Sequence, residues 1–223
     1  ICHCLVGSEM CIRDRLGAAC HLAAKGDFNG RIVFIFQPNE EHGQGARAMI
    51  DDGLFQRFPA DAVFAMHNIP GMKAGSFATR AGPMTASESL FELSVTARGG
   101  HAALPHMGVD AILVGAQLVI ALQSIVSRKL DPARNGVVSI TEFITDGSRN
   151  VLPSSALLKG DARALSDDTN HAIEAHMRRI AAGIAAAHDV DIKVTYGTIF
   201  PSLTNDASAV SHARPLHASD YDL

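Results

Sequence analysis

Arg31-Ile-Val-Phe-Ile-Phe-Gln-Pro-Asn-Glu-Glu-His42 gives the strongest indication of fold class in this 223-residue chain. Its β-branched and aromatic residues predict a buried strand over residues 31–37, and Pro38 ends that strand. Two carboxylates, Glu40 and Glu41, follow directly. A second apolar run, Asp61-Ala-Val-Phe-Ala-Met66, ends in the same way at His67. Because ligands bind at the carboxyl ends of strands in an open parallel sheet, the two strand ends together indicate a metal site.

Helices and a further strand are expected around this stretch. Residues 16–25 are rich in helix formers and end at Gly26, and residues 45–52 predict a second, short helix closed by Gly53. Another strand is expected at residues 75–80. This alternation of helix and strand is typical of an α/β layer built on a parallel sheet.

A different pattern begins after Gly82-Pro83. Residues 91–98 alternate apolar and polar side chains, which predicts a strand with one face in water. Five elements follow in the order helix, strand, strand, helix, strand, at residues 109–129, 136–144, 156–164, 168–188 and 191–196. Ser166 or Asp167 is the expected N-cap of the second helix. The order β-α-β-β-α-β is the split βαβ, or ferredoxin-like, arrangement. The predicted fold class is therefore α/β: a partial parallel-sheet domain with an inserted ferredoxin-like α+β domain.

Composition and charge limit the partners that we expect. The net charge is −4 and no basic cluster occurs, so no nucleic-acid partner is expected. Charged residues or glycines interrupt the longest apolar stretches before they reach membrane-spanning length, so no membrane partner is expected either. The cysteines lie in the first tenth of the chain and cannot cross-link the body of the fold: Cys2, Cys4, Cys11 and Cys20. This distribution predicts a reducing, cytoplasmic location.

The acidic pair after the first strand could divide the work of a hydrolase. One carboxylate of Glu40-Glu41 would bind a metal, and its neighbour would take a proton from the metal-bound water. The alternative is a solvated acidic loop before a helix, where carboxylates favour the positive end of the helix dipole. His67 favours the metal interpretation, since imidazole suits zinc, manganese and cobalt.

Three residues further along the chain could bind substrate or stabilise charge. Gly99 and Gly100 expose His101 on a bend after a strand, where its ring could stabilise an oxyanion, although a turn histidine without a task is the alternative. Asn150 can donate a hydrogen bond to a developing oxyanion. Arg163 can hold a substrate carboxylate through two parallel hydrogen bonds.

Five segments carry a resemblance to a known family, over about Leu16 to Asp206 and in the family's order and spacing. They are Phe34-Ile-Phe-Gln-Pro-Asn-Glu-Glu41, Gly45-Ala-Arg-Ala-Met-Ile-Asp-Asp-Gly-Leu-Phe55, Phe64-Ala-Met-His-Asn68, Gly99-Gly-His-Ala-Ala103 and Asn150-Val-Leu-Pro153. The chain resembles the metal-dependent amidohydrolases related to hippurate hydrolase and the indole-acetyl-amino-acid hydrolases. This is the aminoacylase-like branch of the co-catalytic metallopeptidases.

The resemblance implies metal-dependent hydrolysis of the amide bond of N-acyl amino acids. In the family pattern Glu40 is the general base, while Glu41 and His67 are metal ligands. The ferredoxin-like domain would be a lid and dimerisation domain of a homodimer, from which His101 reaches the active site of the other subunit. Asn150 and Arg163 would bind the substrate. The family site holds two divalent cations, of which manganese, zinc, cobalt and nickel are candidates.

The chain departs from the family pattern at its beginning. Members carry a Cys-Gly-His-Asp-Gly-His segment before the helix that starts near Leu16, and here the expected cysteine and histidine ligands fall on Val6 and Ser8. We therefore expect an incomplete copy that is inactive as it stands. A non-catalytic dimerisation or binding module is the alternative. We expect residues 1–15 to be a non-native segment and residues 16–84 to be the N-terminal part of the catalytic domain. Residues 85–200 would form the lid and dimerisation domain. Residues 201–223 would begin a truncated return to the catalytic domain.

Overall fold

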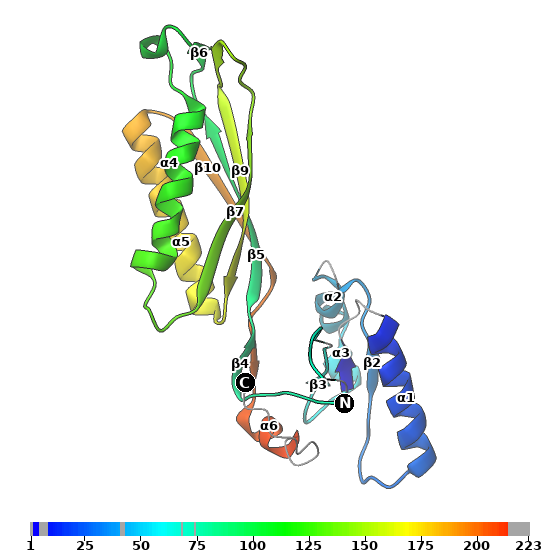
Figure 1. Cartoon of the computed structure of the whole chain (residues 1–223). Helices are drawn as coiled ribbons and strands as arrows, with labels where there is room; N and C mark the ends of the chain where they lie inside the picture. The colour runs from blue at the N-terminus through cyan, green and yellow to red at the C-terminus, as the bar shows by residue number, and fades with distance from the viewer. Residues whose placement is uncertain (1, 5–8, 41–42, 68, 74, 214–223) are drawn as a thin grey trace. The chain divides into compact units, whose positions relative to one another are not determined.

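The computed structural model describes residues 2–4, 9–40, 43–67, 69–73 and 75–213 of the chain (Figure 1). The chain divides into two compact units, and each is described by itself. Unit 1 comprises residues 1–79 and 208–223, and unit 2 comprises residues 80–207.

Unit 1 contains a three-stranded parallel sheet. β2 (Phe34–Phe36) and β3 (Phe64–Ala65) each pair in parallel with β1 (Cys2–Cys4), which lies between them. The predicted α/β layer with parallel strands is therefore confirmed. The strands before Glu40 and His67 are not direct neighbours, because the backbone of β1 pairs with both of them.

The first helix of unit 1 starts earlier than predicted. It is α1 (Glu9–Lys25), and it includes residues that precede the expected start at Leu16. Arg15 on this helix is buried; its guanidinium donates to the carbonyl oxygen of Ile35 and lies 5.2 Å from the ring centre of Phe36. This cation–π and hydrogen-bond contact attaches α1 to β2. The remaining helices are α2 (Gly45–Asp51), α3 (Leu54–Arg57) and α6 (Ala207–Ala213), of which α6 begins at the last residue of unit 2.

The strand predicted at residues 75–80 is wrong. Gly75 has a φ of 82°, and the amide of Ser76 donates to the carbonyl of Lys73 at 3.1 Å, so the chain turns where a strand was expected. The next strand is β4 (Gly82–Thr85), which pairs antiparallel with β11 (Leu203–Asn205) to form a short ribbon.

Unit 2 confirms the predicted β-α-β-β-α-β order. Its four-stranded antiparallel sheet has the order β10-β5-β9-β7. The elements are β5 (Ser87–Thr96), α4 (Ala111–Ser124), β7 (Gly136–Thr145), β9 (Ser155–Ala164), α5 (Asp167–His188) and β10 (Asp191–Phe200). Both helices cover the same face of the sheet (Figure 1). Ser166 is the N-cap of α5, since its side chain accepts from the amide of Thr169.

The hydrophobic core of unit 2 lies between this sheet and the two helices. Alternate residues of β5 point toward the helices, as the period of two predicts. The largest fully buried apolar side chains are Phe91, Leu93, Leu118, Leu122, Ile125, Leu158, Ile173 and Met177. Each contributes roughly 1.5–3 kcal/mol through burial.

One helix in the described part of the chain, residues Ala111–Lys129, is long and apolar enough to cross a membrane by length and composition alone. It consists of α4 and the π-helical turn Ile125–Lys129 that continues it. Val114, Leu118 and Leu122 on this helix are fully buried against the sheet. Packing in a globular core therefore accounts for its apolar inward face.

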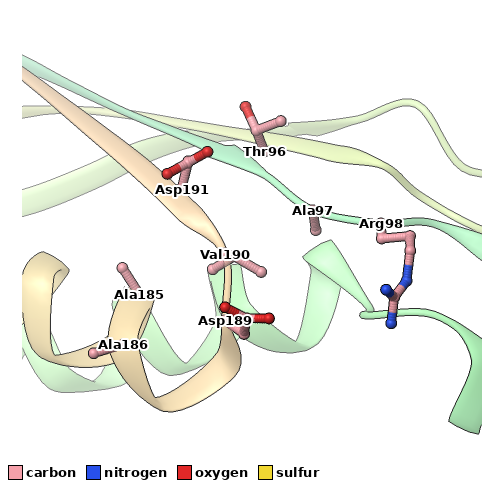
Figure 2. Close-up of a pocket in the computed structure, with 8 residues that line it drawn as sticks. All are labelled: Thr96, Ala97, Arg98, Ala185, Ala186, Asp189, Val190 and Asp191. Carbon is pink, nitrogen blue, oxygen red and sulfur yellow. The ribbon is translucent and has the colours of Figure 1, made fainter.

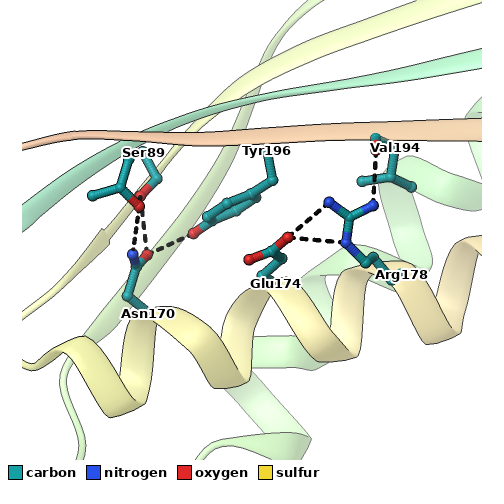
Figure 3. Close-up of polar contacts among 7 residues, drawn as sticks. Ser89, Asn170, Glu174, Arg178, Val194 and Tyr196 are labelled. Carbon is teal, nitrogen blue, oxygen red and sulfur yellow. Dashed lines mark hydrogen bonds and ion pairs between the residues drawn. The ribbon is translucent and has the colours of Figure 1, made fainter.

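A polar cluster ties α5 to β5 and β10 inside unit 2 (Figure 3). The side-chain oxygen of Asn170 accepts from the hydroxyls of Ser89 at 3.0 Å and Tyr196 at 2.6 Å. The Asn170 amide nitrogen donates to Thr198 at 2.9 Å. Burial raises the pKa of the Tyr196 phenol. Because every member has a partner, the cluster joins one helix to two strands without an unsatisfied amide.

Tyr196→Phe should lower the free energy of unfolding by about 1 kcal/mol at pH 7, because it removes one hydrogen bond. Because its pKa is raised in the folded state, the phenol makes the free energy of unfolding depend on pH. Its contribution to this free energy is complete below its ordinary pKa of 10.0 and is lost as the pH rises through the raised pKa. The variant should therefore lose less stability than the wild type above pH 10. Urea titrations between pH 7 and pH 11 measure both effects, and an equal alkaline loss in the two proteins would contradict the prediction.

Candidate active site

Glu40 lies just beyond the carboxyl end of β2. The chain turns there, and the amide of Gly43 donates to the carbonyl of Glu40 at 2.8 Å. A Cβ atom on Gly45 would lie 1.5 Å from the carbonyl oxygen of Pro38, so only glycine allows α2 to begin this close to the strand end. The side chain of Glu40 is half-buried. Glu41, the predicted metal ligand beside it, lies outside the described residues.

His67 follows the carboxyl end of β3, and its side chain is exposed. Phe36 of β2 lies beside Cys4, and Ala65 of β3 lies beside His3, on the two sides of the same central strand. All three strands run in parallel, so their carboxyl ends form one edge of the sheet. The strand ends that precede Glu40 and His67 therefore lie at the same edge, separated by β1.

The described residues do not form a complete metal centre. Within the described ranges, no group of three His, Cys, Asp or Glu side chains is placed so that it could hold a metal ion. A protein zinc site uses three or four protein ligands, and a pair of ions needs more. Glu40 and His67 have suitable donor atoms, but two residues do not fit two ions.

In unit 2, a short ribbon brings His101 and Asn150 together. The ribbon consists of β6 (Gly100–His101) and β8 (Val151–Leu152), with His101 opposite Val151. The amide of Ala102 donates to the carbonyl of Asn150 at 2.9 Å. A tight turn holds Asn150, since Ser148 and Val151 bond to each other's backbone at 3.3 and 3.1 Å. Both side chains are exposed, and the ribbon makes their backbones neighbours although they are far apart in the sequence.

The ring of His101 has a defined hydrogen-bonding role. Its Nδ1 atom accepts from the amide of Ala103 at 3.1 Å. A nitrogen that accepts carries no proton, so the neutral ring carries its proton on Nε2. This tautomer leaves an Nε2–H group on an exposed ring, and such a group can donate to a negatively charged oxygen.

Arg163 lies elsewhere in unit 2. Its Nη2 atom is 2.9 Å from Glu88 and its Nε atom is 2.8 Å from Asp161, and the hydrogen bond to Asp161 is the main cause of its raised pKa. Ser155, at the start of β9, is next to the ribbon. Arg163 lies eight residues further along this strand, and at roughly 3.3 Å per residue the distance from Ser155 to Arg163 is about 26 Å. The structure thus does not bring Arg163 together with His101 and Asn150. A substrate carboxylate would compete with two carboxylates of the chain for its guanidinium, and the substrate-binding role stays a prediction.

A cavity of about 350 Å³ lies elsewhere in unit 2 (Figure 2). It is formed where β5 ends and where α5 passes into β10, and its charged lining residues are Arg98, Asp189 and Asp191. None of the predicted site residues lines it. It is open to solvent, and the predicted site chemistry lies on the ribbon and at the sheet edge instead.

Sequence reasoning missed a carboxylate next to the ribbon. Asp146 lies at the end of the strand before Asn150, and its two oxygens accept from the side chain of Ser154 and the amide of Ser155. In the sequence, Asp146-Gly147 has the pattern of a turn and gives no sign of a further role. The two serines that follow Pro153 were the available clue, because a turn aspartate is often held by donors across its loop.

The chain matches known proteins over most of its length. A model of peptidase family M20/M25/M40 matches residues 15–219. Hippurate hydrolase of Campylobacter jejuni is 40% identical over 196 residues, which cover 88% of this chain and 51% of that protein. N-acetylcysteine deacetylase of Bacillus subtilis is 34% identical over 209 residues, covering 94% of this chain and 52% of that protein.

A solved structure agrees with these matches. The YxeP protein of Bacillus subtilis, described as a dinuclear metal-binding peptidase of the M20 family, superposes with a TM-score of 0.71 at 30% identity. The match covers 89% of this chain and 49% of that chain. The chain spans about half the length of the curated relatives it matches. Since the family model matches nearly the whole chain, this protein belongs to peptidase family M20/M25/M40.

Proposed function

We propose that the full-length form of this protein hydrolyses the amide bond of N-acyl amino acids. By full-length form we mean the chain extended to the length of its relatives, with the family's Cys-Gly-His-Asp-Gly-His segment restored before Leu16. The products would be a carboxylic acid and a free amino acid. The names of the relatives support this substrate class, since hippurate and N-acetylcysteine are both N-acyl amino acids. The observation that supports the proposal is the β6–β8 ribbon, in which the backbones of His101 and Asn150 are neighbours.

Each residue has one task in the proposed reaction. Glu40 takes a proton from the attacking water and passes it to the leaving amine. His101, through Nε2–H, and Asn150, through its side-chain amide, donate to the oxyanion of the tetrahedral intermediate. Glu41 and His67 would contribute to a metal site that is completed by ligands other than the described residues. A divalent cation at such a site lowers the pKa of a bound water and polarises the amide carbonyl.

We further propose that unit 2 is the lid and dimerisation domain of a homodimer. Ile120 on α4 is 74% exposed, and Leu113, about two turns earlier on the same side of the helix, is exposed as well. A helix that is apolar on all sides is usually covered on all sides. α4 contacts β7, which is an edge strand of the sheet. A second copy seated on α4 and β7 would cover this apolar surface and pair the open strand edge.

A substrate panel tests the proposed activity. The full-length form is expected to release free amino acid from at least one of N-benzoylglycine, N-acetylcysteine and N-acetyldiaminopimelate when supplied with manganese, zinc, cobalt or nickel. Chelation with EDTA should abolish the release, and added metal should restore it. The 223-residue chain is the control and should show no turnover, because Val6 and Ser8 occupy the positions of two expected metal ligands. Absence of cleavage with every substrate and metal, or cleavage that resists EDTA, would refute the proposal.

A further inference from the structure

The loop that carries Asn150 is closed at its base by one carboxylate. This loop, residues 146–154, joins β7 to β9 and contains β8. Asp146 accepts from the hydroxyl of Ser154 at 2.7 Å through Oδ2 and from the amide of Ser155 at 2.9 Å through Oδ1. These hydrogen bonds lower the pKa of Asp146 to about 2. The carboxylate is therefore charged at neutral pH.

The closed base is connected to His101 by continuous backbone contacts. The amide of Ala97 donates to the carbonyl of Ser154 at 2.8 Å. A Cβ on Gly99 would lie 2.5 Å from the carbonyl oxygen of Leu152 and 3.0 Å from the amide nitrogen of Ser154, so the two backbones touch without an intervening side chain. The β6–β8 pairs follow, and the amide of Ala102 bonds to the carbonyl of Asn150 at the far end. Residues 97–102 are thus joined to residues 150–154 along their whole length.

We propose that Asp146 is a positioning residue for His101 and Asn150, the two proposed oxyanion donors. By holding Ser154 and Ser155, Asp146 sets the register in which the loop of Asn150 pairs with the strand of His101. The catalytic part of this inference rests on the proposed function, while its structural part does not. Asp146 makes no contact with His101 or Asn150 among the hydrogen bonds of the described residues, so it acts through the backbone. A displacement of about 1 Å in a catalytic group can cost about a hundredfold in rate, so this register matters.

The chain contains a matched control for this aspartate. Asp131 is also exposed, belongs to unit 2 and accepts from the amide of a residue in its own turn, Ala133, at 2.9 Å. Its turn precedes β7 and is not part of the β6–β8 ribbon. Asp131→Ala therefore removes a similar hydrogen bond without touching the loop of Asn150.

Amide hydrogen exchange in the 223-residue chain tests the structural part. Asp146→Ala should speed exchange at Ala97 and Ala102 at least tenfold, because both amides depend on the alignment of the two segments. Asp146→Asn should stay within threefold of wild type, since its side-chain oxygen can still accept from Ser155. Asp131→Ala should speed exchange at Ala133 alone. The exchange rates of the amides that pair β5 with β9 should be unchanged in all three variants. This comparison separates a local effect from general destabilisation.

Steady-state kinetics of the full-length form test the catalytic part. Asp146→Ala should lower kcat at least tenfold with KM within about threefold, and Asp146→Asn should restore most of the loss. Unchanged exchange at Ala97 and Ala102 in Asp146→Ala, or an equal rise throughout the sheet, would overturn the positioning role. Faster exchange at these amides with an unchanged kcat would overturn its link to catalysis. If the wild type has no activity, the proposed function fails, and the exchange data still decide the structural part.

Discussion

Glu40→Gln should lower kcat of the full-length form by a factor of about 10²–10⁴, the usual contribution of a general base. Glutamine has nearly the shape of glutamate but cannot accept the proton of the attacking water. Folding and metal content should stay close to wild type, because Glu40 is proposed to move a proton and not to bind the ion. The measurements are steady-state hydrolysis of the best substrate of the panel and metal content by atomic emission.

Glu92→Gln is the matched control, since it makes the same chemical change on β5, where Glu92 is exposed and 3.9 Å from Lys159. Its kcat should stay within about twofold of wild type, as expected for a surface substitution. Wild-type turnover in Glu40→Gln would show that another group is the base. Loss of metal together with activity would show that Glu40 is a ligand, and the roles of Glu40 and Glu41 would then have to be exchanged.

His101→Ala should lower kcat by a factor of about 10²–10³, as the loss of one oxyanion donor does in other hydrolases. The Nδ1 atom of His101 accepts from the amide of Ala103, so the proton of the neutral ring is on Nε2, where it can be donated. His106→Ala is the control: this histidine is also exposed and lies in the one-turn 3₁₀ helix Pro105–Met107, beyond the ribbon. Its kcat should be unchanged.

Mixed dimers then test whether His101 acts across the subunit interface. Consider a dimer of one His101→Ala subunit and one Glu40→Gln subunit. One of its two active sites would combine Glu40 of the first subunit with His101 of the second and would be intact. An equal mixture that re-equilibrates freely should recover about a quarter of wild-type activity, because half of the dimers are mixed and each has one intact site. If mixing restores no activity although exchange of subunits is demonstrated, His101 acts within its own subunit or has no catalytic role.

Local periodicity was sufficient to predict most of unit 2. The alternation in residues 91–98 and the apolar face of residues 168–188 correspond to β5 and α5, and the capping serine was among the two residues expected. These features depend on neighbours in sequence, since a strand or helix must turn one face toward the core whatever lies opposite. The predictions were poorer in unit 1, where β2 and β3 are only three and two residues long. Elements this short carry too few residues for a period to be recognised.

The residue types of the candidate site and the two kinds of domain could be read from the sequence. Which of these residues are neighbours became clear from the folded chain. It inserts β1 between the strands that precede Glu40 and His67, and it pairs His101 with the loop of Asn150 through Ala102. It also places Glu88 and Asp161 on Arg163. Each of these contacts joins residues far apart in the chain, so it depends on strand order and register, which are settled by the packing of the whole sheet and not by any local stretch.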